Sequence, residues 1–299
     1  MNTKHDYSCP PIILIGMHRS GTSMLAGLLQ QLNLYIGRDL DSNNESFFFK
    51  RINDWLLTQA NASWHNPSPI QYAPDYYKKL MVEIVSHRLN SFNRVNYLGF
   101  SKTLKHKSIR QLSFNWGWKD PRNTFTIDIW REIFPESKII HIYRHPVDVV
   151  KSMYKREDEF DFIVKDNPSK TGLKKLCYGY KLPTRKLYCQ PFKTLDYNGI
   201  FDLWKEYVSK ALYVCHNNQD KIIHISYEEI LKNPLEVLKR VVNFADLSLS
   251  EEDICNAANK INPQRRLAFL EDKSLREYYH QIKDDSLVRK LNYDNIQTE

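Results

Sequence analysis

The pattern of apolar and polar positions predicts alternating strands and helices along most of the chain. Residues 12–15 form an uninterrupted apolar run, Ile-Ile-Leu-Ile, which is typical of a parallel strand covered on both faces. A polar loop bounded by glycines follows, and apolar residues then recur at helical spacing, at Met24, Leu25, Leu28, Leu29 and Leu32. Strand, glycine-containing loop and amphipathic helix form the opening unit of a nucleotide-binding α/β domain.

The alternation of strands and helices continues through the rest of the chain. Apolar runs predict strands at 138–143 and 221–226. Apolar residues at helical spacing predict helices at 47–60, 76–92, 123–134, 200–216, 235–244 and 251–260. Pro146, shortly after the strand at 138–143, suits the first position of a further helix. This order predicts an α/β fold, a three-layer α/β/α sandwich around a central, mainly parallel sheet of the P-loop-containing nucleotide-binding type.

Two stretches do not follow this alternation. Residues 94–116 have mixed character, and we expect at most one strand there, near Phe114. Residues 155–198 form a long segment without a clear period, rich in Lys, Tyr and Pro, which is typical of a lid or a binding loop in a compact domain. We therefore expect a single domain over residues 1–299, with an irregular basic insertion at 155–198.

Composition and charge narrow the class of protein. With 42% hydrophobic and 26% charged residues, the 299-residue chain has the balance of a globular protein. The apolar run at 12–15 is too short to span a membrane, and residues 1–9 lack the apolar segment of a signal peptide, so we expect a cytoplasmic protein without a membrane span. Five scattered cysteines without metal-ligand spacing indicate reduced thiols and no metal site. The net charge of +8 favours an anionic partner, and without a nucleic-acid-binding pattern we expect a nucleotide-like or small anionic molecule.

The loop after the first strand has the frame of a phosphate-binding loop. Residues 16–23 read Gly-Met-His-Arg-Ser-Gly-Thr-Ser, with four residues between the glycines. Such a loop directs several backbone N–H groups and a helix N-terminus at one anionic group. In nucleoside triphosphatases a Lys follows the second glycine, whereas here Thr22 stands there and the basic residue, Arg19, lies inside the loop. A plain glycine-containing turn between strand and helix is the simpler alternative.

Residues 18–23 resemble the 5′-phosphosulfate loop of sulfotransferases that use 3′-phosphoadenosine-5′-phosphosulfate (PAPS). That loop reads Pro-[Lys/Arg]-Ser-Gly-Thr-[Ser/Thr] after a strand, and here the sequence is His-Arg-Ser-Gly-Thr-Ser. The resemblance implies that Arg19 acts at the bridging oxygen and the sulfuryl group. It also implies that the 5′-phosphate is held by the N–H groups and hydroxyls of Ser20, Gly21, Thr22 and Ser23. His18 stands where many relatives have Pro, and its role is left open.

A second segment resembles the site for the 3′-phosphate, which distinguishes PAPS from other nucleotides. Family members carry an Arg at the end of a strand and a Ser eight residues later on the following helix, and Arg144 and Ser152 repeat this spacing around an Arg-x-Pro-x-Asp core. Arg offers a charged fork to a phosphate, and Ser adds a hydroxyl. The plain alternative is a helix start with a surface Ser. The resemblance covers roughly residues 11–270 and implies PAPS as donor, its desulfated product PAP, and no metal.

Further segments resemble the bacterial, tyrosylprotein and heparan branch of the family. Tyr227, in Ser-Tyr-Glu-Glu, matches a Tyr that contacts the adenine, and Lys119, in Trp-Gly-Trp-Lys-Asp-Pro, matches a residue near the transferring sulfuryl. Arg265 and Arg266 stand where cytosolic relatives carry an Arg-Lys-Gly loop on the 3′-phosphate, although the Gly is absent here.

Sulfuryl transfer is an in-line displacement in which the acceptor loses a proton, so a general base is expected. Glu45 precedes three Phe residues and resembles the base of glucosaminyl 3-O-sulfotransferases, although a carboxylate favoured by a helix start is the alternative. Asp120 lies one residue from the position that matches the catalytic His of cytosolic relatives, but before Pro its role is also explained by holding a loop. His18 lies in the loop itself. We rank them in the order Glu45, Asp120, His18.

The acceptor is the part of the reaction that stays open. Residues 165–193 hold eight Lys or Arg against one acid, which predicts either a solvated basic face or a lid over an anionic or sugar-like acceptor. We expect transfer to a hydroxyl, or an amine, of a saccharide or small natural product. The alternatives are a P-loop kinase or nucleotidase, and a non-catalytic nucleotide-binding protein on the same fold. Neither the acceptor nor the oligomeric state follows from the sequence.

Overall fold

The computed structural model describes residues 9–165, 191–216 and 219–298, apart from the side chains at 157–165, 215, 216 and 219. The chain divides into two compact units. The first comprises Met1–His145 with Glu206–Ala268, and the second comprises Pro146–Lys205 with Phe269–Glu299. The expectation of one sulfotransferase domain over the whole chain stays a prediction.

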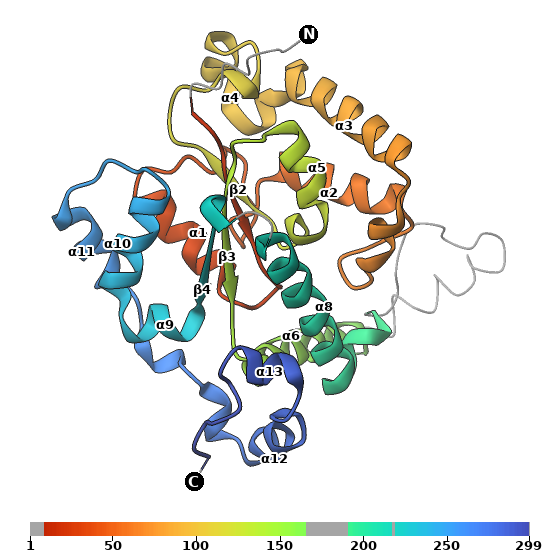
Figure 1. Ribbon diagram of the computed structural model, residues 1–299, viewed down its shortest axis with the longest axis vertical. Coiled ribbons are helices and arrows are strands. Elements are labelled where there is room, and N and C mark those ends of the chain that lie inside the picture. The colour runs from red at the N-terminus through yellow and green to blue at the C-terminus, as the bar shows by residue number, and fades with distance from the viewer. Residues whose placement is uncertain (1–8, 166–190, 217–218, 299) are drawn as a thin grey trace. The chain divides into compact units, whose positions relative to one another are not determined.

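A four-stranded parallel sheet lies at the centre of the first unit (Figure 1). Its strands are β1 (Ile12–Ile15), β2 (Gly117–Lys119), β3 (Lys138–Tyr143) and β4 (Ile222–Ser226), in the order β2-β1-β3-β4. Leu14 pairs with Lys119 on one side and with Ile140 on the other, so β1 is an inner strand. Every side chain of β1 is buried, as its uninterrupted apolar sequence requires. The predicted parallel sheet is confirmed.

One face of this sheet is covered by α1 (Thr22–Gln31), α9 (Tyr227–Lys232), α10 (Pro234–Phe244) and α11 (Glu251–Ala258) (Figure 1). Leu25 and Leu29 of α1 and Leu238 and Val241 of α10 are fully buried in one apolar cluster with the strands. Pro234 begins α10 at a position where its missing N–H costs no hydrogen bond. This layer holds the helix that follows the glycine loop firmly against the sheet.

The opposite face is covered by α2 (Phe47–Gln59), α3 (Asp75–Asn90), α4 (Val95–Lys105) and α5 (Asn123–Ile133) (Figure 1). Its core is aromatic: the Phe49 ring stacks on Trp118 with centroids 4.0 Å apart, and Trp130 meets Trp118 edge-on at 4.9 Å. Such pairs add about 0.5–1.5 kcal/mol to the burial of their area. The helices on the two faces and the sheet between them confirm the three-layer α/β/α sandwich.

The second unit contains α6 (Pro146–Lys165), the start of α8 (Tyr197–His216), α12 (Lys273–Ile282) and α13 (Ser286–Lys290). Asp148, the acid of the Arg-x-Pro-x-Asp segment, accepts a hydrogen bond from the backbone N–H of Phe269 at 2.9 Å. The Tyr278 hydroxyl donates to Asn198 at 3.1 Å. These contacts join α6 and α8 to the C-terminal segment.

The two irregular stretches contain more helix than predicted. Residues 95–105 form α4, whose helical pattern is interrupted at Gly99 with φ of 74°. The prediction of at most one strand near Phe114 agrees with β2, which begins three residues after it. Helix α6 runs through Lys165, so the irregular segment does not begin at residue 155. Most of the predicted basic insertion, residues 166–190, lies outside the described residues.

Candidate active site

The predicted site residues follow the carboxyl ends of the parallel strands. The glycine loop follows β1, Lys119 ends β2, Arg144 follows β3 and Tyr227 follows β4. In an open parallel sheet these ends lie along one edge, where ligands bind in this class of fold. Segments more than 200 residues apart in the chain are therefore brought to one edge of the first unit (Figure 1).

Two positions in the loop require glycine. At Gly16, with φ of 142°, a Cβ would lie 2.3 Å from the carbonyl oxygen of Ile142. The backbone N–H of Gly16 donates to the hydroxyl of Thr124 at 3.1 Å. At Gly21, with φ of 91°, a Cβ would lie 2.3 Å from the ring of Tyr227. The first glycine thus lets β1 and β3 approach, and the second lets the Tyr227 ring rest on the loop.

The loop presents groups that suit an anion. Helix α1 begins at Thr22 without a side-chain cap, so its N-terminus faces the loop. The Ser20 hydroxyl is buried and has no hydrogen-bond partner among the described residues. A buried hydroxyl without a partner carries a desolvation cost of about 1–3 kcal/mol, which an anion accepting its proton would remove. Arg19, the one Lys or Arg of the loop, is exposed. Its φ of 69° is uncommon for a residue other than glycine.

A second cationic group lies against Tyr227. The Arg144 guanidinium is 4.5 Å from the centroid of that ring, and one of its N–H groups donates to the backbone carbonyl of Arg265 at 3.2 Å. A pocket of about 340 Å³ lies here, within the size range of roughly 300–1,000 Å³ typical of small-ligand sites. Residues from two distant segments of the chain line it: Ser23, Met24, Gly27, Leu28, Gln31, Tyr227, Lys260, Ile261, Asn262 and Arg265.

Glu45 lies at the centre of a buried ionic cluster. One carboxylate oxygen is 2.9 Å from the Nζ of Lys119, and the other is 3.2 Å from both Arg122 and Lys50. Burial alone would raise the pKa of Glu45, but Lys119, Arg122 and Lys50 outweigh it and lower the pKa below its ordinary value. Glu45 is therefore a carboxylate at neutral pH, held in place from three sides.

The turn that carries Glu45 touches the glycine loop directly. The Asn44 amide donates to the carbonyl of Ser23 at 3.1 Å, and Lys119 donates to the carbonyl of Asn43 at 2.9 Å. Asn44 has φ of 60°, a conformation that Asn tolerates better than most residues. This turn thus places the ionic cluster beside the N-terminus of α1.

Asp120 has a different environment from Glu45. It is fully buried; one oxygen accepts hydrogen bonds from the backbone N–H and the Nε of Arg122 at 2.9 Å, and the other accepts from Asn53 at 2.9 Å. Burial raises the pKa of Asp120, Arg122 lowers it and Glu45 raises it again. Both oxygens are used to hold the segment after β2, which favours the loop-holding alternative for Asp120.

Asn53 connects this cluster to the core. Its amide nitrogen donates to Asp120 and, at 2.8 Å, to Asn123, while its oxygen accepts from Thr126 and Trp130 at 2.8 Å each. Sequence reasoning missed both Asn53 and Arg122. For Asn53, an amide at a helical position that is otherwise apolar could have indicated a buried hydrogen-bond hub, since such groups are buried only when satisfied.

His18 lies among aromatic rings rather than in the ionic cluster. Its ring meets Trp64 at a centroid distance of 5.0 Å and Tyr207 at 6.2 Å, both in edge-to-face geometry. His141 and His224, on neighbouring strands, pair with each other through their Nδ1 atoms at 2.8 Å. These two histidines therefore pack against each other across the sheet.

Ser152 lies on α6, in the second unit, so its role beside Arg144 stays a prediction. Arg266 is exposed at the end of a short 3₁₀ helix, Pro263–Arg265, and does not line the pocket. Arg265 lines the pocket and receives the hydrogen bond from Arg144.

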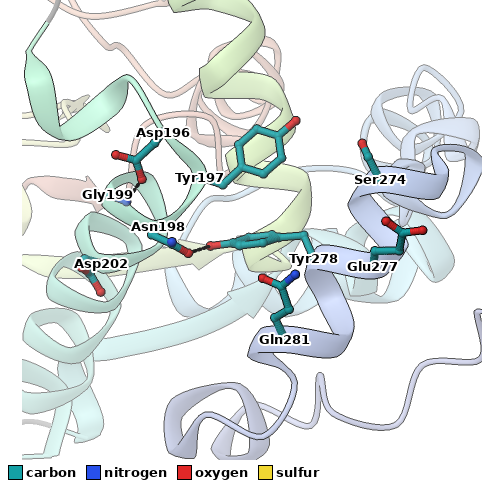
Figure 2. Close-up of a pocket in the computed structure, with 9 residues that line it drawn as sticks. All are labelled: Asp196, Tyr197, Asn198, Gly199, Asp202, Ser274, Glu277, Tyr278 and Gln281. Carbon is teal, nitrogen blue, oxygen red and sulfur yellow. Dashed lines mark hydrogen bonds between the residues drawn. The ribbon is translucent and has the colours of Figure 1, made fainter.

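The second unit has a pocket of about 730 Å³ with an acidic lining (Figure 2). Tyr197 and Tyr278 meet edge-on within it at 5.2 Å, and the hydrogen bond from Tyr278 to Asn198 crosses it (Figure 2). Three carboxylates, Asp196, Asp202 and Glu277, line it and would repel a phosphate or sulfate. The cationic pocket of the first unit is therefore the candidate nucleotide site.

Among the described residues, no helix is long and apolar enough to cross a membrane. Within the same residues, no three or more His, Cys, Asp or Glu side chains gather as metal ligands.

Comparison with known proteins places the chain in a family. The model of the Sulfotransferase family matches residues 10–175. A putative protein-tyrosine sulfotransferase of Caenorhabditis briggsae is 24% identical over 183 residues, covering 58% of this chain and 55% of that protein. A similarly described protein of Caenorhabditis elegans is 25% identical over 134 residues, covering 45% of this chain and 40% of that protein. The chain thus spans about half the length, or less, of these curated relatives.

Solved structures of sulfotransferases are also similar to this chain. The sulfotransferase domain of the Synechococcus PCC 7002 olefin synthase has a TM-score of 0.48 and 15% identity, with 99% of each chain covered. A sulfotransferase of Alicyclobacillus acidocaldarius has a TM-score of 0.47 and 15% identity, covering 96% of this chain and 97% of that one. Since the family model matches more than half of the residues, including the glycine loop and the segment around Arg144, the chain belongs to the sulfotransferase family.

Proposed function

We propose that the protein transfers a sulfuryl group from PAPS to an acceptor hydroxyl. The observation that carries this proposal is the arrangement of Arg144, Tyr227 and Arg265 beside the glycine loop. The Tyr227 ring rests on the glycine loop, which suits the 5′-phosphate, and over that ring lies the Arg144 guanidinium, a cation for a second phosphate. A nucleoside triphosphate has no phosphate at the 3′ position, so a kinase or nucleotidase would gain nothing from this second site.

The residues of the loop fit the 5′-phosphosulfate of the donor. The Ser20 hydroxyl and the uncapped N-terminus of α1 supply donors for phosphate oxygens. Tyr227 offers its ring for the adenine, and Arg144 offers its fork to the 3′-phosphate. When bound, the donor supplies the electrophilic sulfur and a leaving group that departs as PAP.

Reaction requires that the acceptor oxygen bond to sulfur as the bond from sulfur to the bridging oxygen breaks. Negative charge then grows on the leaving phosphate, where Arg19 is suited to stabilise it. Lys119 ends β2 close to the loop and is suited to the same task or to holding Glu45. The proton of the acceptor passes to a base as the new bond forms.

Glu45 is the base that the geometry favours. Its carboxylate is ionised at neutral pH and lies on the turn that touches Ser23. Asp120 instead holds the segment after β2 through hydrogen bonds from Arg122 and Asn53, and His18 lies in an aromatic setting. A base held by three cations is weak, so it acts best on an acceptor whose hydroxyl is already polarised or acidic.

The acceptor has two candidates. A saccharide or small natural product is the expectation from the sequence. The relatives in the two Caenorhabditis species are described as putative protein-tyrosine sulfotransferases, which favours a tyrosyl hydroxyl as a second candidate. Transfer of labelled sulfate from PAPS to a panel of sugars, phenols and tyrosine peptides distinguishes them.

Calorimetry tests the donor. We expect 3′,5′-adenosine bisphosphate to bind without metal and ATP to bind much more weakly. Arg144→Ala should weaken binding of the bisphosphate by at least tenfold, and binding of 5′-AMP far less, because only the bisphosphate has a 3′-phosphate. Arg131→Ala, on α5 rather than at the pocket, serves as the matched control. Equal losses for both ligands would refute the assignment of Arg144.

A further inference from the structure

An aromatic corner is formed at the glycine loop by His18, Trp64 and Tyr207. His18, the third residue of the loop, meets Trp64 at a centroid distance of 5.0 Å and Tyr207 at 6.2 Å, both in edge-to-face geometry. His18 and Trp64 are both half-buried, and the Nε2 atom of His18 is itself buried. Tyr207 is fully buried and supports the corner from behind.

The position of Trp64 is held by several contacts. The Tyr207 hydroxyl donates to the backbone carbonyl of Trp64 at 2.8 Å. Four residues further on, the Ser68 hydroxyl bonds to Glu206 at 2.7 Å, and Tyr207 itself packs edge-on against Phe125 at 4.9 Å. The loop that carries Trp64 is thus fixed to α8 at two points, and a half-buried Trp held in this way is preorganised for a contact.

The corner also adjoins the residues proposed for catalysis. Burial raises the pKa of Tyr207, Arg122 lowers it, and the charges of Asp120, Glu206 and Glu45 raise it further. Phe125, whose ring meets Tyr207 at 4.9 Å, lies three residues after Arg122, and Arg122 pairs with Glu45 at 3.2 Å. At its other end the corner contains His18, one residue before Arg19. The corner thus connects the sulfuryl-binding loop with the helix that begins next to Arg122.

We infer that His18 and Trp64 form the subsite for the ring of a phenolic acceptor, whose hydroxyl is thereby presented to the loop and to Glu45. The inference deepens the proposed function and rests on it. Aromatic rings prefer edge-to-face or offset contacts at centroid distances of about 4.5–7 Å, and the corner offers two ring surfaces already arranged in that way. The aromatic run at Phe47–Phe49 does not fill this role, because Phe48 and Phe49 are buried in the core.

The chemistry of Glu45 agrees with a phenol. A phenolic hydroxyl such as that of tyrosine has a pKa of about 10, whereas the pKa of an aliphatic hydroxyl is far higher. A carboxylate stabilised by three cations is a weak base, so it needs an acceptor that loses its proton readily. A phenol meets that requirement far better than a sugar hydroxyl.

The test compares Trp64→Ala and Trp64→Phe in the full chain with PAPS as donor. The acceptors are p-nitrophenol, a tyrosine peptide and methyl glucoside. We expect Trp64→Ala to raise the KM for both phenols by tenfold or more, Trp64→Phe to raise it less, and the Kd for PAP to stay unchanged. Tyr213→Ala, which removes an aromatic ring that is 67% exposed on α8, should leave every value unchanged.

A second measurement does not depend on turnover. Quenching of tryptophan fluorescence by p-nitrophenol in the complex with PAP should saturate in the wild type and lose its saturable part in Trp64→Phe. Unchanged KM and unchanged quenching in a Trp64 variant that still binds PAP would overturn the subsite alone. So would efficient transfer to methyl glucoside with no transfer to either phenol. A wild-type protein that binds no PAP would overturn the proposed function and the subsite with it.

Discussion

The Glu45 carboxylate and the Lys119 ammonium form a buried ion pair 2.9 Å long, in which Lys119 is 2% exposed and Glu45 is 3% exposed. Burying two charges costs several kcal/mol each, and only good geometry with further hydrogen bonds repays the cost. Here Lys119 also donates a hydrogen bond to the carbonyl of Asn43, and Glu45 also forms ion pairs with Arg122 and Lys50. A chain that keeps such a cluster next to its anion-binding loop is expected to use it in catalysis.

Glu45→Gln should lower kcat by about 10²–10⁴-fold, the usual contribution of a general base. The amide keeps the shape of the side chain but cannot take the proton. Binding of PAP, measured by calorimetry, should change little because Glu45 does not line the nucleotide pocket. A variant with wild-type kcat and intact folding would exclude Glu45 as the base.

Arg122→Gln should move the acid limb of the kcat/KM profile to higher pH. Arg122 is one of the cations that lower the pKa of Glu45, so its removal raises that pKa, and the carboxylate is then protonated at a higher pH. The measurement is the pH profile with p-nitrophenol. Arg240→Gln removes an exposed Arg that pairs with Glu229 and should leave the profile in place. An acid limb that stays fixed in Arg122→Gln would assign it to another group.

Acidification should destabilise the protein through His141 and His224. Burial lowers the pKa of both, and the neighbouring His224 lowers that of His141 further, so the folded state favours the neutral rings. The unfolded chain binds protons near its ordinary pKa of about 6.5. The free energy of unfolding is therefore unaffected by these histidines above about pH 6.5, and it declines as the pH falls from there toward their lowered folded-state pKa. Urea unfolding at pH 7.5 and 5.5 measures the loss, and the double variant His141→Phe/His224→Asn should flatten it. The same pH dependence in that variant would point to other groups.

Asn53→Ala should cost about 3 kcal/mol or more in the free energy of unfolding. The change leaves Asp120, Trp130 and Thr126 without one hydrogen bond each, and every buried group left unsatisfied costs about 1–3 kcal/mol. Urea unfolding measures it. Asn259→Ala, at an exposed Asn on the surface, is the control and should stay within about 0.5 kcal/mol of the wild type. A change of only about 0.5 kcal/mol in Asn53→Ala would mean that Asp120, Trp130 and Thr126 find other hydrogen-bond partners.

The motifs could be read from the sequence because their geometry is local. A glycine with positive φ, a helix N-terminus and a strand that precedes them lie within a dozen residues, and short-range sterics decide their conformation. The parallel strands at 12–15 and 138–143 have the predicted bounds because a strand buried on both faces must be apolar throughout. Helix α4 was not predicted because Gly99 interrupts the helical spacing of its apolar residues. The bounds of strand β2 were not predicted because three residues are too few to show a periodic pattern.

The sequence by itself thus determined the class of fold, and it predicted the anion-binding loop and Arg144. Only the tertiary structure decided which residues meet around them. It gives the two candidate bases different surroundings: Glu45 pairs with three cations on a turn beside the loop, and Asp120 accepts hydrogen bonds from Arg122 and Asn53. It brings Trp64 and Tyr207, 46 and 189 residues away in the chain, to the ring of His18. Such contacts follow from how helices pack on the sheet, and long-range packing leaves no periodic mark on either segment.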